Sequence, residues 1–294
     1  MHKEKRNRIM SLLSLNDLPR FSPWPARLLG SDSWEVHYKS LKEIEREYDQ
    51  EKWGPLLARL RKDSKIVSIE DVDRLVLSDM PGTLACFLDG GIKLVQPFDF
   101  SVLYLEFLEN LLKRYLPASA FAEFGCGYGY IILNMARRQF FNGLPLIAAD
   151  YVQSGVDLVK EIACRQGSAV TVDRCDLGSA TITNLSIPEG AVIFTSFSAT
   201  YVPQLREQFV NALSRLKPKA VIHFEPCYEH ADSKTLFGLM KQRYIEVNDY
   251  NRNLVSLLHQ QQSVGKIKIL EELPDVIGHN ALLPASVLVW RPLK

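Results

Sequence analysis

The sequence has no excess of charge of either sign. It contains 35 Lys and Arg against 34 Asp and Glu, which gives a net charge of +1 at pH 7. Proteins dedicated to binding nucleic acid usually carry a clear basic excess. The composition therefore argues against such a protein, and we expect no nucleic-acid partner.

Long apolar runs and a cysteine framework are also missing. No apolar stretch reaches the roughly 18 residues of a membrane-spanning helix. Residues 1–10 are polar, contain Glu4 and lack the apolar segment of a signal peptide. The cysteines include no C-x-x-C pair, which is typical of reduced thiols rather than of disulfides or a zinc site. They are Cys86, Cys126, Cys164, Cys175 and Cys227. We therefore expect a cytoplasmic protein with no membrane partner and no metal.

Residues 1–98 hold no strong chemical motif, and we interpret them as a mainly helical cap that covers the substrate. A helix is expected from Ser40 to Arg61, broken in two at Gly54-Pro55. The Asp89-Gly90 pair between two apolar runs predicts a β-hairpin. The aromatic residues of this region either line a substrate pocket or pack the cap onto the core. They are Trp24, Trp34, Tyr38 and Trp53.

Residues 99–294 form the second predicted domain. An amphipathic helix is expected over residues 99–115, because its apolar residues recur at helical spacing. Apolar strands and amphipathic helices then alternate, which predicts a parallel α/β sheet. Expected helices include 153–165 and 202–216, and a long bent helical region covers 233–262. Two final strands, 266–270 and 285–290, are joined by a connection too short for a helix that crosses the sheet.

A glycine-rich turn from Glu123 to Gly129 follows the first strand of this region. Such a turn lets the backbone approach a ligand closely, and the next helix presents free N–H groups to it. The third glycine of the dinucleotide pattern G-x-G-x-x-G would fall on Tyr130, so that pattern fails. The pattern present is E-x-G-x-G-x-G. Taken alone, it is also compatible with a purely structural turn.

Two acidic residues end the strands that follow. Asp150 comes directly after the apolar run Leu144 to Ala149, close to the roughly 20-residue offset of ribose-binding acids. A carboxylate there can accept hydrogen bonds from both ribose hydroxyls. Asp176 ends the third strand. Each acid alone could be a solvated loop carboxylate, but three signals in the right order favour a nucleoside-containing cofactor.

These residues resemble motif I and its following acids in the class I S-adenosylmethionine (SAM)-dependent methyltransferases. The resemblance implies a doubly wound, mostly parallel, seven-stranded Rossmann-like sheet with the N-terminal cap, and SAM as the cofactor. It implies that the glycines pack against the methionine part of SAM, and that Asp176 lies near the adenine amino group. The expected cofactor-binding residues are Glu123, Gly125, Cys126, Gly127, Gly129, Asp150, Tyr151, Asp176 and Ser196.

The carboxyl end of the fifth strand is the expected place for catalysis, because doubly wound sheets bind ligands at that edge. Glu225 precedes Pro226 there and is predicted to face the cleft as a base, with His230 as a second catalytic candidate. It is also possible that Glu225 caps a loop and that His230 is a surface residue. The expected substrate contacts are Tyr201, Glu229, Asp249 and Tyr250.

The sequence thus predicts a SAM-dependent methyltransferase that acts on a small polar metabolite. The acceptor is expected to be a nitrogen of an amino acid, amine or guanidine, because Glu225, Glu229 and Asp249 would make the cleft mouth acidic. The chain also resembles small-molecule methyltransferases of bacterial specialised metabolism. A sugar O-methyltransferase and a catalytically silent scaffold subunit are the competing hypotheses. A homodimer is left open.

Overall fold

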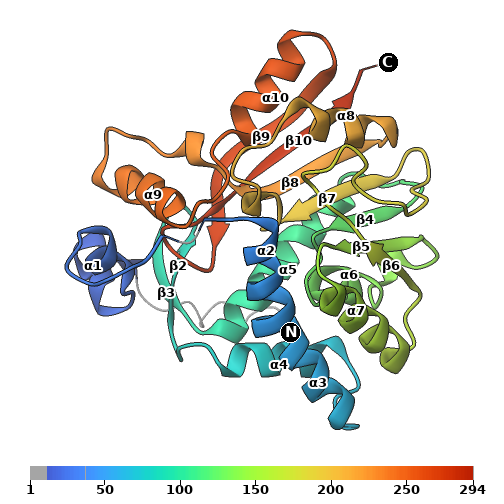
Figure 1. The fold of residues 1–294 in the computed structure, drawn as a ribbon, viewed down its shortest axis with the longest axis horizontal. Coiled ribbons are helices and arrows are strands. Elements are labelled where there is room, and N and C mark those ends of the chain that lie inside the picture. The colour runs from blue at the N-terminus through green and yellow to red at the C-terminus, as the bar shows by residue number, and fades with distance from the viewer. Residues whose placement is uncertain (1–11, 37, 294) are drawn as a thin grey trace.

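The computed structural model describes residues 12–36 and 38–293, which build one ten-stranded sheet with helices on both faces (Figure 1). The strand order is β1-β3-β2-β9-β10-β8-β7-β4-β5-β6. The strands are β1 (Leu12–Leu13), β2 (Leu84–Leu88), β3 (Gly91–Val95), β4 (Phe121–Phe124), β5 (Leu146–Asp150), β6 (Val170–Arg174), β7 (Val192–Ser196), β8 (Ala220–Pro226), β9 (Ile267–Gly278) and β10 (Ala285–Pro292).

The helices fill most of the remaining chain. They are α1 (Trp24–Leu28), α2 (Leu41–Ile44), α3 (Gly54–Lys62), α4 (Ile69–Ser78), α5 (Pro97–Lys113), α6 (Tyr130–Met135), α7 (Gln153–Gln166), α8 (Glu207–Arg215), α9 (Leu236–Val247) and α10 (Leu254–Ser263). A π-helix, η3 (Glu45–Trp53), joins α2 to α3. Short 3₁₀ segments are η2 (Leu15–Arg20), η4 (Gln139–Phe141), η5 (Ala199–Tyr201) and η6 (Tyr228–His230).

Seven strands form the predicted mostly parallel core, β6-β5-β4-β7-β8-β10-β9. The pairs β6/β5, β5/β4, β4/β7 and β7/β8 are parallel, whereas β10 is antiparallel to both of its neighbours. Alternate strand residues point to opposite faces. Phe121 accordingly packs with α5, α6 and α7, whereas Ala122 packs with α8 and α10. The predicted sheet and its final hairpin are confirmed.

The N-terminal region differs from a purely helical cap, because it extends the sheet by three strands. β2 pairs with β9 through Phe87–Gly278 and Leu88–Ile277, and β3 and β1 follow outward. The predicted hairpin is confirmed, and Asp89 and Gly90 have φ values of 48° and 75°. Strands that precede residue 98 and strands that follow residue 99 therefore belong to one sheet, although the sequence suggested a domain boundary between these two residues.

The predicted break at Gly54-Pro55 is wrong. Helix α2, η3 and α3 follow one another without a gap, because the wider π turn accommodates the proline at the start of α3. The Gly54 N–H donates to the carbonyl of Asp49, five residues earlier. A Cβ at Gly54 would lie 2.3 Å from that carbonyl oxygen, so the turn requires glycine.

Three other element boundaries differ from the prediction. Helix α8 begins at Glu207 rather than at 202, because η5 and a loop containing Pro203 precede it. β6 ends at Arg174, two residues before Asp176. β9 continues to Gly278, well beyond the predicted end at 270, because it keeps pairing with β10 as far as Ile277 and its last two residues pair with β2. The bend between α9 and α10 is confirmed.

Candidate cofactor and active site

The glycine loop connects β4 to α6 at the carboxyl edge of the sheet. Gly125, Gly127 and Gly129 have φ values of 78°, 56° and 84°, which disfavour residues with a Cβ. A Cβ at Gly125 would also lie 2.1 Å from Cβ of Ser198 in the loop after β7. The loop can therefore take this path only with glycine.

Asp150 fixes the glycine loop to the end of β5. Its Oδ2 accepts a hydrogen bond from the N–H of Gly127 at 2.7 Å, and its Oδ1 accepts one from Val152 at 3.0 Å. The carboxyl group is buried, and burial raises its pKa from 3.8 to about 6. A Cβ at Gly155 would lie 2.9 Å from Oδ1, so α7 begins close against it.

Glu123 and Ser196 lie deeper at the same edge. Glu123 is buried, and its Oε2 accepts from the N–H of Ile132 in the first turn of α6 at 3.0 Å. Burial raises the pKa of Glu123 well above its ordinary value. The hydroxyl of Ser196 contacts that of Tyr104 on α5. Glu123 thus positions the helix that follows the glycine loop.

A cavity of about 830 Å³ opens at this edge, within the range of small-molecule and cofactor sites. Eight of the nine predicted cofactor residues line it. They are Glu123, Gly125, Cys126, Gly127, Asp150, Tyr151, Asp176 and Ser196. Gly129 does not, because it packs close to Leu133 and Val159. Tyr201 is the predicted substrate residue among the lining.

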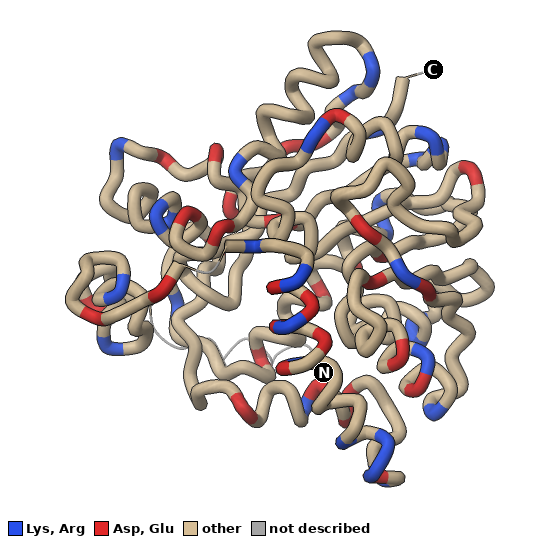
Figure 2. The backbone as a smooth tube through the Cα atoms, in the orientation of Figure 1, with Lys and Arg blue, Asp and Glu red and all other residues tan. Residues whose placement is uncertain are grey.

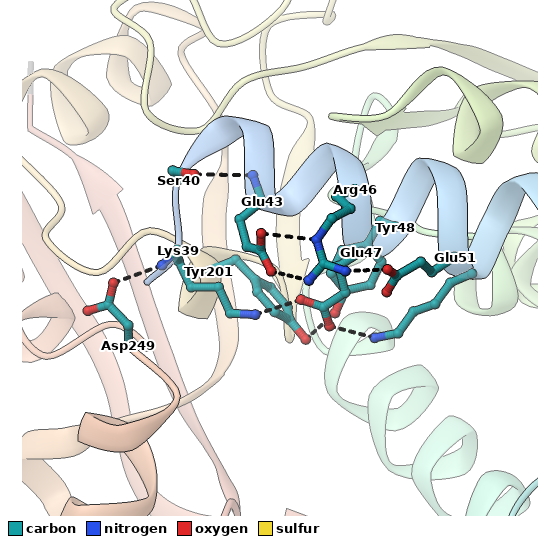
Figure 3. Close-up of polar contacts among 10 residues, drawn as sticks. Lys39, Ser40, Glu43, Arg46, Glu47, Tyr48, Glu51, Tyr201 and Asp249 are labelled. Atoms are coloured by element: carbon teal, nitrogen blue, oxygen red, sulfur yellow. Dashed lines mark hydrogen bonds and ion pairs between the residues drawn. The ribbon is translucent and has the colours of Figure 1, made fainter. Parts of the chain in front are cut away.

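The π-helix η3 forms a roof over the glycine loop. Tyr48 and Trp53 line the cavity from this side, and a Cβ at Gly127 would lie 3.2 Å from the Trp53 ring. The Tyr48 hydroxyl bonds that of Tyr201 on the opposite wall (Figure 3). Asp49 accepts from the N–H of Ser154 at 2.9 Å, at the N-terminus of α7. The roof is therefore attached on both sides of the cavity.

Asp249, a predicted substrate residue, belongs to the support of this roof. Its Oδ2 accepts from the backbone N–H of Lys39 at 2.9 Å, just before α2 (Figure 3). Its second oxygen pairs with Arg252 at 3.1 Å. The Lys39 ammonium pairs with Glu47 at 2.6 Å and lies 5.3 Å from the centre of the Tyr201 ring. Asp249 is absent from the described cavity lining.

Glu225, the predicted base, is 1% exposed and lies behind the cavity wall. Its carboxylate accepts from the backbone N–H groups of Ser198 and Ala199, each at 3.0 Å, and of Thr200 at 3.1 Å. These bonds hold the loop after β7. The geometry therefore matches a residue that caps a loop rather than a base in contact with substrate.

Three further predicted residues also lie outside the described cavity lining. His230 bonds Ser286 at 2.8 Å and Glu272 at 2.9 Å. Glu229 accepts from the N–H groups of Val255 and Ser256, so it caps the N-terminus of α10. The Tyr250 ring packs against that of Tyr201, with 5.4 Å between centroids. Tyr250 therefore supports a lining residue from behind.

Several lining residues had no motif to mark them. They are Tyr48, Asp73, Tyr104, Tyr128 and His279. Tyr128 lies within the glycine loop and Tyr104 on the apolar face of α5, so their positions held a signal. Asp73 and His279 come from α4 and the β9–β10 connection, which reach the site only through tertiary folding. Of the four N-terminal aromatics, Trp53 lines the cavity, whereas Trp24 and Trp34 pack together at 4.6 Å.

The described part of the chain contains neither a side-chain cluster that could hold a metal ion nor a helix that could span a membrane. Within residues 12–36 and 38–293, no group of three or more His, Cys, Asp and Glu side chains could hold a metal ion. No helix in that part of the chain is long and apolar enough to span a membrane.

The cavity residues fit SAM. Gly125 and Gly127 line the cavity without side chains, so a ligand can approach their backbone closely, and the Asp150 carboxylate is an acceptor suited to a ribose diol. SAM carries a sulfonium and an ammonium group. Six acidic side chains but two cationic ones, Lys52 and Arg59, are among the described lining residues. Glu51 is paired with Arg46, which lies outside that lining, and the other five acids favour a cationic ligand. The six acids are Glu51, Asp73, Asp79, Glu123, Asp150 and Asp176.

No family model matches the chain. The tRNA N(3)-methylcytidine methyltransferase trm140 of Schizosaccharomyces pombe is 28% identical over 177 residues, which cover 59% of this chain and 54% of that protein. The chain thus spans about half the length of this curated relative.

Two solved structures are similar at low identity. A SAM-dependent methyltransferase from Aquifex aeolicus is 16% identical, covers 63% of this chain and 89% of its own, and has a TM-score of 0.43. A putative sarcosine dimethylglycine methyltransferase from Galdieria sulphuraria is 13% identical, with coverages of 67% and 88% and a TM-score of 0.49. We assign the fold from the strand order and not from these identities and TM-scores. By that order, and by the glycine loop and acids at its carboxyl edge, the chain has the fold of the class I SAM-dependent methyltransferases.

Proposed function

We propose that this chain is a SAM-dependent methyltransferase that acts on a nitrogen of a small basic metabolite. The observation that carries the proposal is the cavity at the carboxyl edge, where the glycine loop and Asp150 are joined. SAM, when bound, supplies an electrophilic methyl group. The chain's own residues would orient the acceptor, exclude water and take up its proton.

The acidic lining supports a basic acceptor. The three acids that first suggested one, Glu225, Glu229 and Asp249, are engaged elsewhere. The excess of carboxylates in the described lining replaces them as support. Aromatic side chains around the cavity add to the attraction, because ring faces interact favourably with cations.

His279 is the side chain that we propose as proton acceptor. It lines the cavity as an exposed residue, and desolvation by the cavity wall lowers its pKa below the ordinary value of 6.5, so the neutral form predominates at pH 7. A neutral imidazole can take the proton that an amine must lose before or during methyl transfer. The distance between the His279 ring and the acceptor nitrogen depends on how the substrate binds. Positioning under the roof would supply most of the remaining catalysis.

A tRNA substrate is the second candidate, favoured by the similarity to the fission-yeast enzyme. Against it, the backbone view in Figure 2 shows Lys and Arg interspersed with Asp and Glu rather than gathered in one basic stripe. The competing hypotheses of a sugar hydroxyl acceptor and of a silent scaffold predict different outcomes of the experiment below.

Calorimetry with SAM, followed by a methyl-transfer panel, tests the proposal. We expect SAM to bind wild-type protein, and methyl transfer to amines, amino acids or guanidines. His279→Gln should lower kcat about 100-fold with little change in SAM affinity. Turnover of free or nucleotide-linked sugars alone would replace the nitrogen assignment, and turnover of tRNA alone would replace the small-metabolite assignment. Absence of SAM binding would leave the scaffold hypothesis.

A further inference from the structure

A buried carboxylate in the cavity wall has no charged partner in the described part of the chain. Asp73 lies on α4, is 6% exposed and lines the cavity. Its Oδ1 accepts a hydrogen bond from the Tyr128 hydroxyl at 2.9 Å, and its Oδ2 accepts one from the Ser101 hydroxyl at 3.0 Å. Both donors are neutral, so neither balances the negative charge.

The charge of Asp73 is also poorly compensated beyond these two bonds. The Ser101 Oγ lies 2.6 Å from the Tyr130 oxygen, so its single proton is shared between two acceptors. Among residues 12–36 and 38–293, no ion pair joins Asp73 to Lys, Arg or His. An unpaired buried carboxylate is costly, and burial raises the pKa of Asp73. A cation entering the cavity would remove this cost.

The surroundings suit an organic ammonium group better than a metal ion. The Tyr128 ring lies 5.4 Å from that of Trp53 and 6.1 Å from that of Tyr130, centre to centre. Aromatic rings stabilise alkylammonium groups by cation–π contact. A metal ion would need several carboxylate, imidazole or thiolate ligands, and the described residues offer no such group here.

We propose that Asp73 and Tyr128 form an ammonium-binding site, with Asp73 as its anionic anchor and Ser101 as a donor that orients the carboxylate without contacting the ligand. The proposal rests on the proposed methyltransferase function and adds a residue that no motif marks. The ammonium has two sources, the amino-acid part of SAM and the amine of the acceptor. Tyr128 belongs to the glycine loop, so the first source would be bound beside that loop.

Isothermal titration of the full chain tests the site and separates the sources. The probes are S-adenosylhomocysteine, methylthioadenosine, which lacks the amino-acid part, and ethylammonium added to protein saturated with S-adenosylhomocysteine. Asp73→Asn should weaken one ammonium-bearing probe at least about tenfold, the loss typical of one charged hydrogen bond. The affinity of this variant for methylthioadenosine should stay within about twofold of the wild-type value.

The pattern of losses identifies the ligand. Weaker binding of S-adenosylhomocysteine assigns the site to the cofactor ammonium, whereas loss of ethylammonium alone assigns it to the acceptor. Glu70→Gln, which changes a surface acid of the same helix that is absent from the described cavity lining, is the control for long-range electrostatics and should change neither affinity by more than about twofold. Unchanged affinities in Asp73→Asn, or equal losses in the control, would overturn the site. Failure of wild-type protein to bind S-adenosylhomocysteine would instead overturn the proposed function.

Stability measurements separate an anchor from a structural residue. Removing an uncompensated buried charge should leave the melting temperature of Asp73→Asn unchanged or higher at pH 7. Ser101→Ala keeps the charge and removes one donor, so it should retain ammonium binding. If Asp73→Asn does not fold, or if Ser101→Ala loses affinity together with melting temperature, Asp73 is a structural residue and the proposal is wrong.

Discussion

At the residue scale, hydrogen-bond partners separate the roles of chemically similar carboxylates. Asp150 joins the glycine loop to β5, yet still lines the cavity. Glu225 uses its acceptor capacity on three backbone N–H groups behind the wall. Asp73 has two neutral hydroxyl donors inside the cavity. Of these three carboxylates, only Asp150 and Asp73 line the cavity, where they can contact a ligand.

The raised pKa of Asp150 predicts a pH-dependent cofactor affinity. A ribose diol bonds best to the charged carboxylate, so SAM affinity should fall as the pH drops below about 6, where Asp150 takes up a proton. Asp150→Asn should bind SAM about 10–100-fold more weakly at pH 8 and lose this part of the pH dependence. Calorimetry from pH 5 to 8 measures both. A wild-type affinity that is flat across this range would contradict the ribose role.

The same shift has the opposite effect on folding stability. The pKa of Asp150 is higher in the folded chain than its ordinary value of 3.8, so the folded state binds the proton more tightly. Its contribution to stability is complete below pH 4 and is lost as the pH rises through about 6. Urea unfolding of wild type and Asp150→Asn at several pH values should show this difference. A contribution that grows with pH would refute it.

Glu225→Ala is expected to destabilise the protein rather than remove a proton acceptor. It leaves the N–H groups of the loop after β7 buried without their acceptor, at a cost of about 1–3 kcal/mol or more. The free energy of unfolding, measured with urea, should fall by that amount. Glu225→Gln keeps one acceptor oxygen and should lose less. A large fall in kcat without loss of stability would restore Glu225 as the base.

At the element scale, the π-helix η3 covers the cavity on the side of the glycine loop. Figure 3 shows its polar contacts around Lys39, Glu47 and Tyr48, and these contacts differ in burial. The Lys39–Glu47 pair is largely buried, whereas Arg46 pairs with Glu43 and Glu51 at the exposed surface. Exposed pairs contribute little to stability. The roof is therefore held by its buried contacts and by Asp49 at α7.

Asp49→Ala should loosen this roof and speed the release of bound cofactor. The variant removes a carboxylate acceptor at the N-terminus of α7, a contact worth about 1 kcal/mol, so dissociation of S-adenosylhomocysteine should accelerate roughly fivefold. Stopped-flow fluorescence can follow it, because Trp53 lies against the glycine loop. Arg46→Ala, on the exposed side of the same helix, is the control and should release the ligand at the wild-type rate. Equal rates in both variants would show that η3 does not gate release.

At the scale of the whole molecule, the N-terminal region shares one hydrophobic core with the sheet. Leu57, Leu60 and Ile69 from α3 and α4 pack in the same cluster as Ile131 of α6 and Val159 of α7. β2 also pairs with β9. We therefore expect residues 1–98 and 99–294 to unfold together rather than as two independent domains.

Leu60→Ala tests this expectation. Leu60 is 1% exposed, and its truncation should lower the free energy of unfolding by about 2–5 kcal/mol. Urea transitions followed by tryptophan fluorescence and by far-ultraviolet circular dichroism should coincide and shift together. Two separated transitions, with only the earlier one shifted by the substitution, would show that the cap unfolds by itself.

The sequence by itself determined the parallel sheet, the glycine loop and the acid at the end of β5. These depend on local patterns: apolar periodicity, glycines where φ is positive, and an acid at the end of a strand. Each is specified within a few residues of chain. The hairpin at Asp89-Gly90 was predictable for the same reason.

Only the tertiary structure decided which acids face the cavity. Glu225 and Asp73 are both buried carboxylates, and their sequence neighbours do not distinguish a loop cap from a cavity wall. The difference comes from residues far along the chain, namely the Ser198–Thr200 backbone for Glu225 and Tyr128 for Asp73. Contacts at such separation depend on how elements pack, which no local pattern records. The residues expected to contact the acceptor therefore lie mostly outside the described lining, whereas eight of the nine expected cofactor residues lie within it.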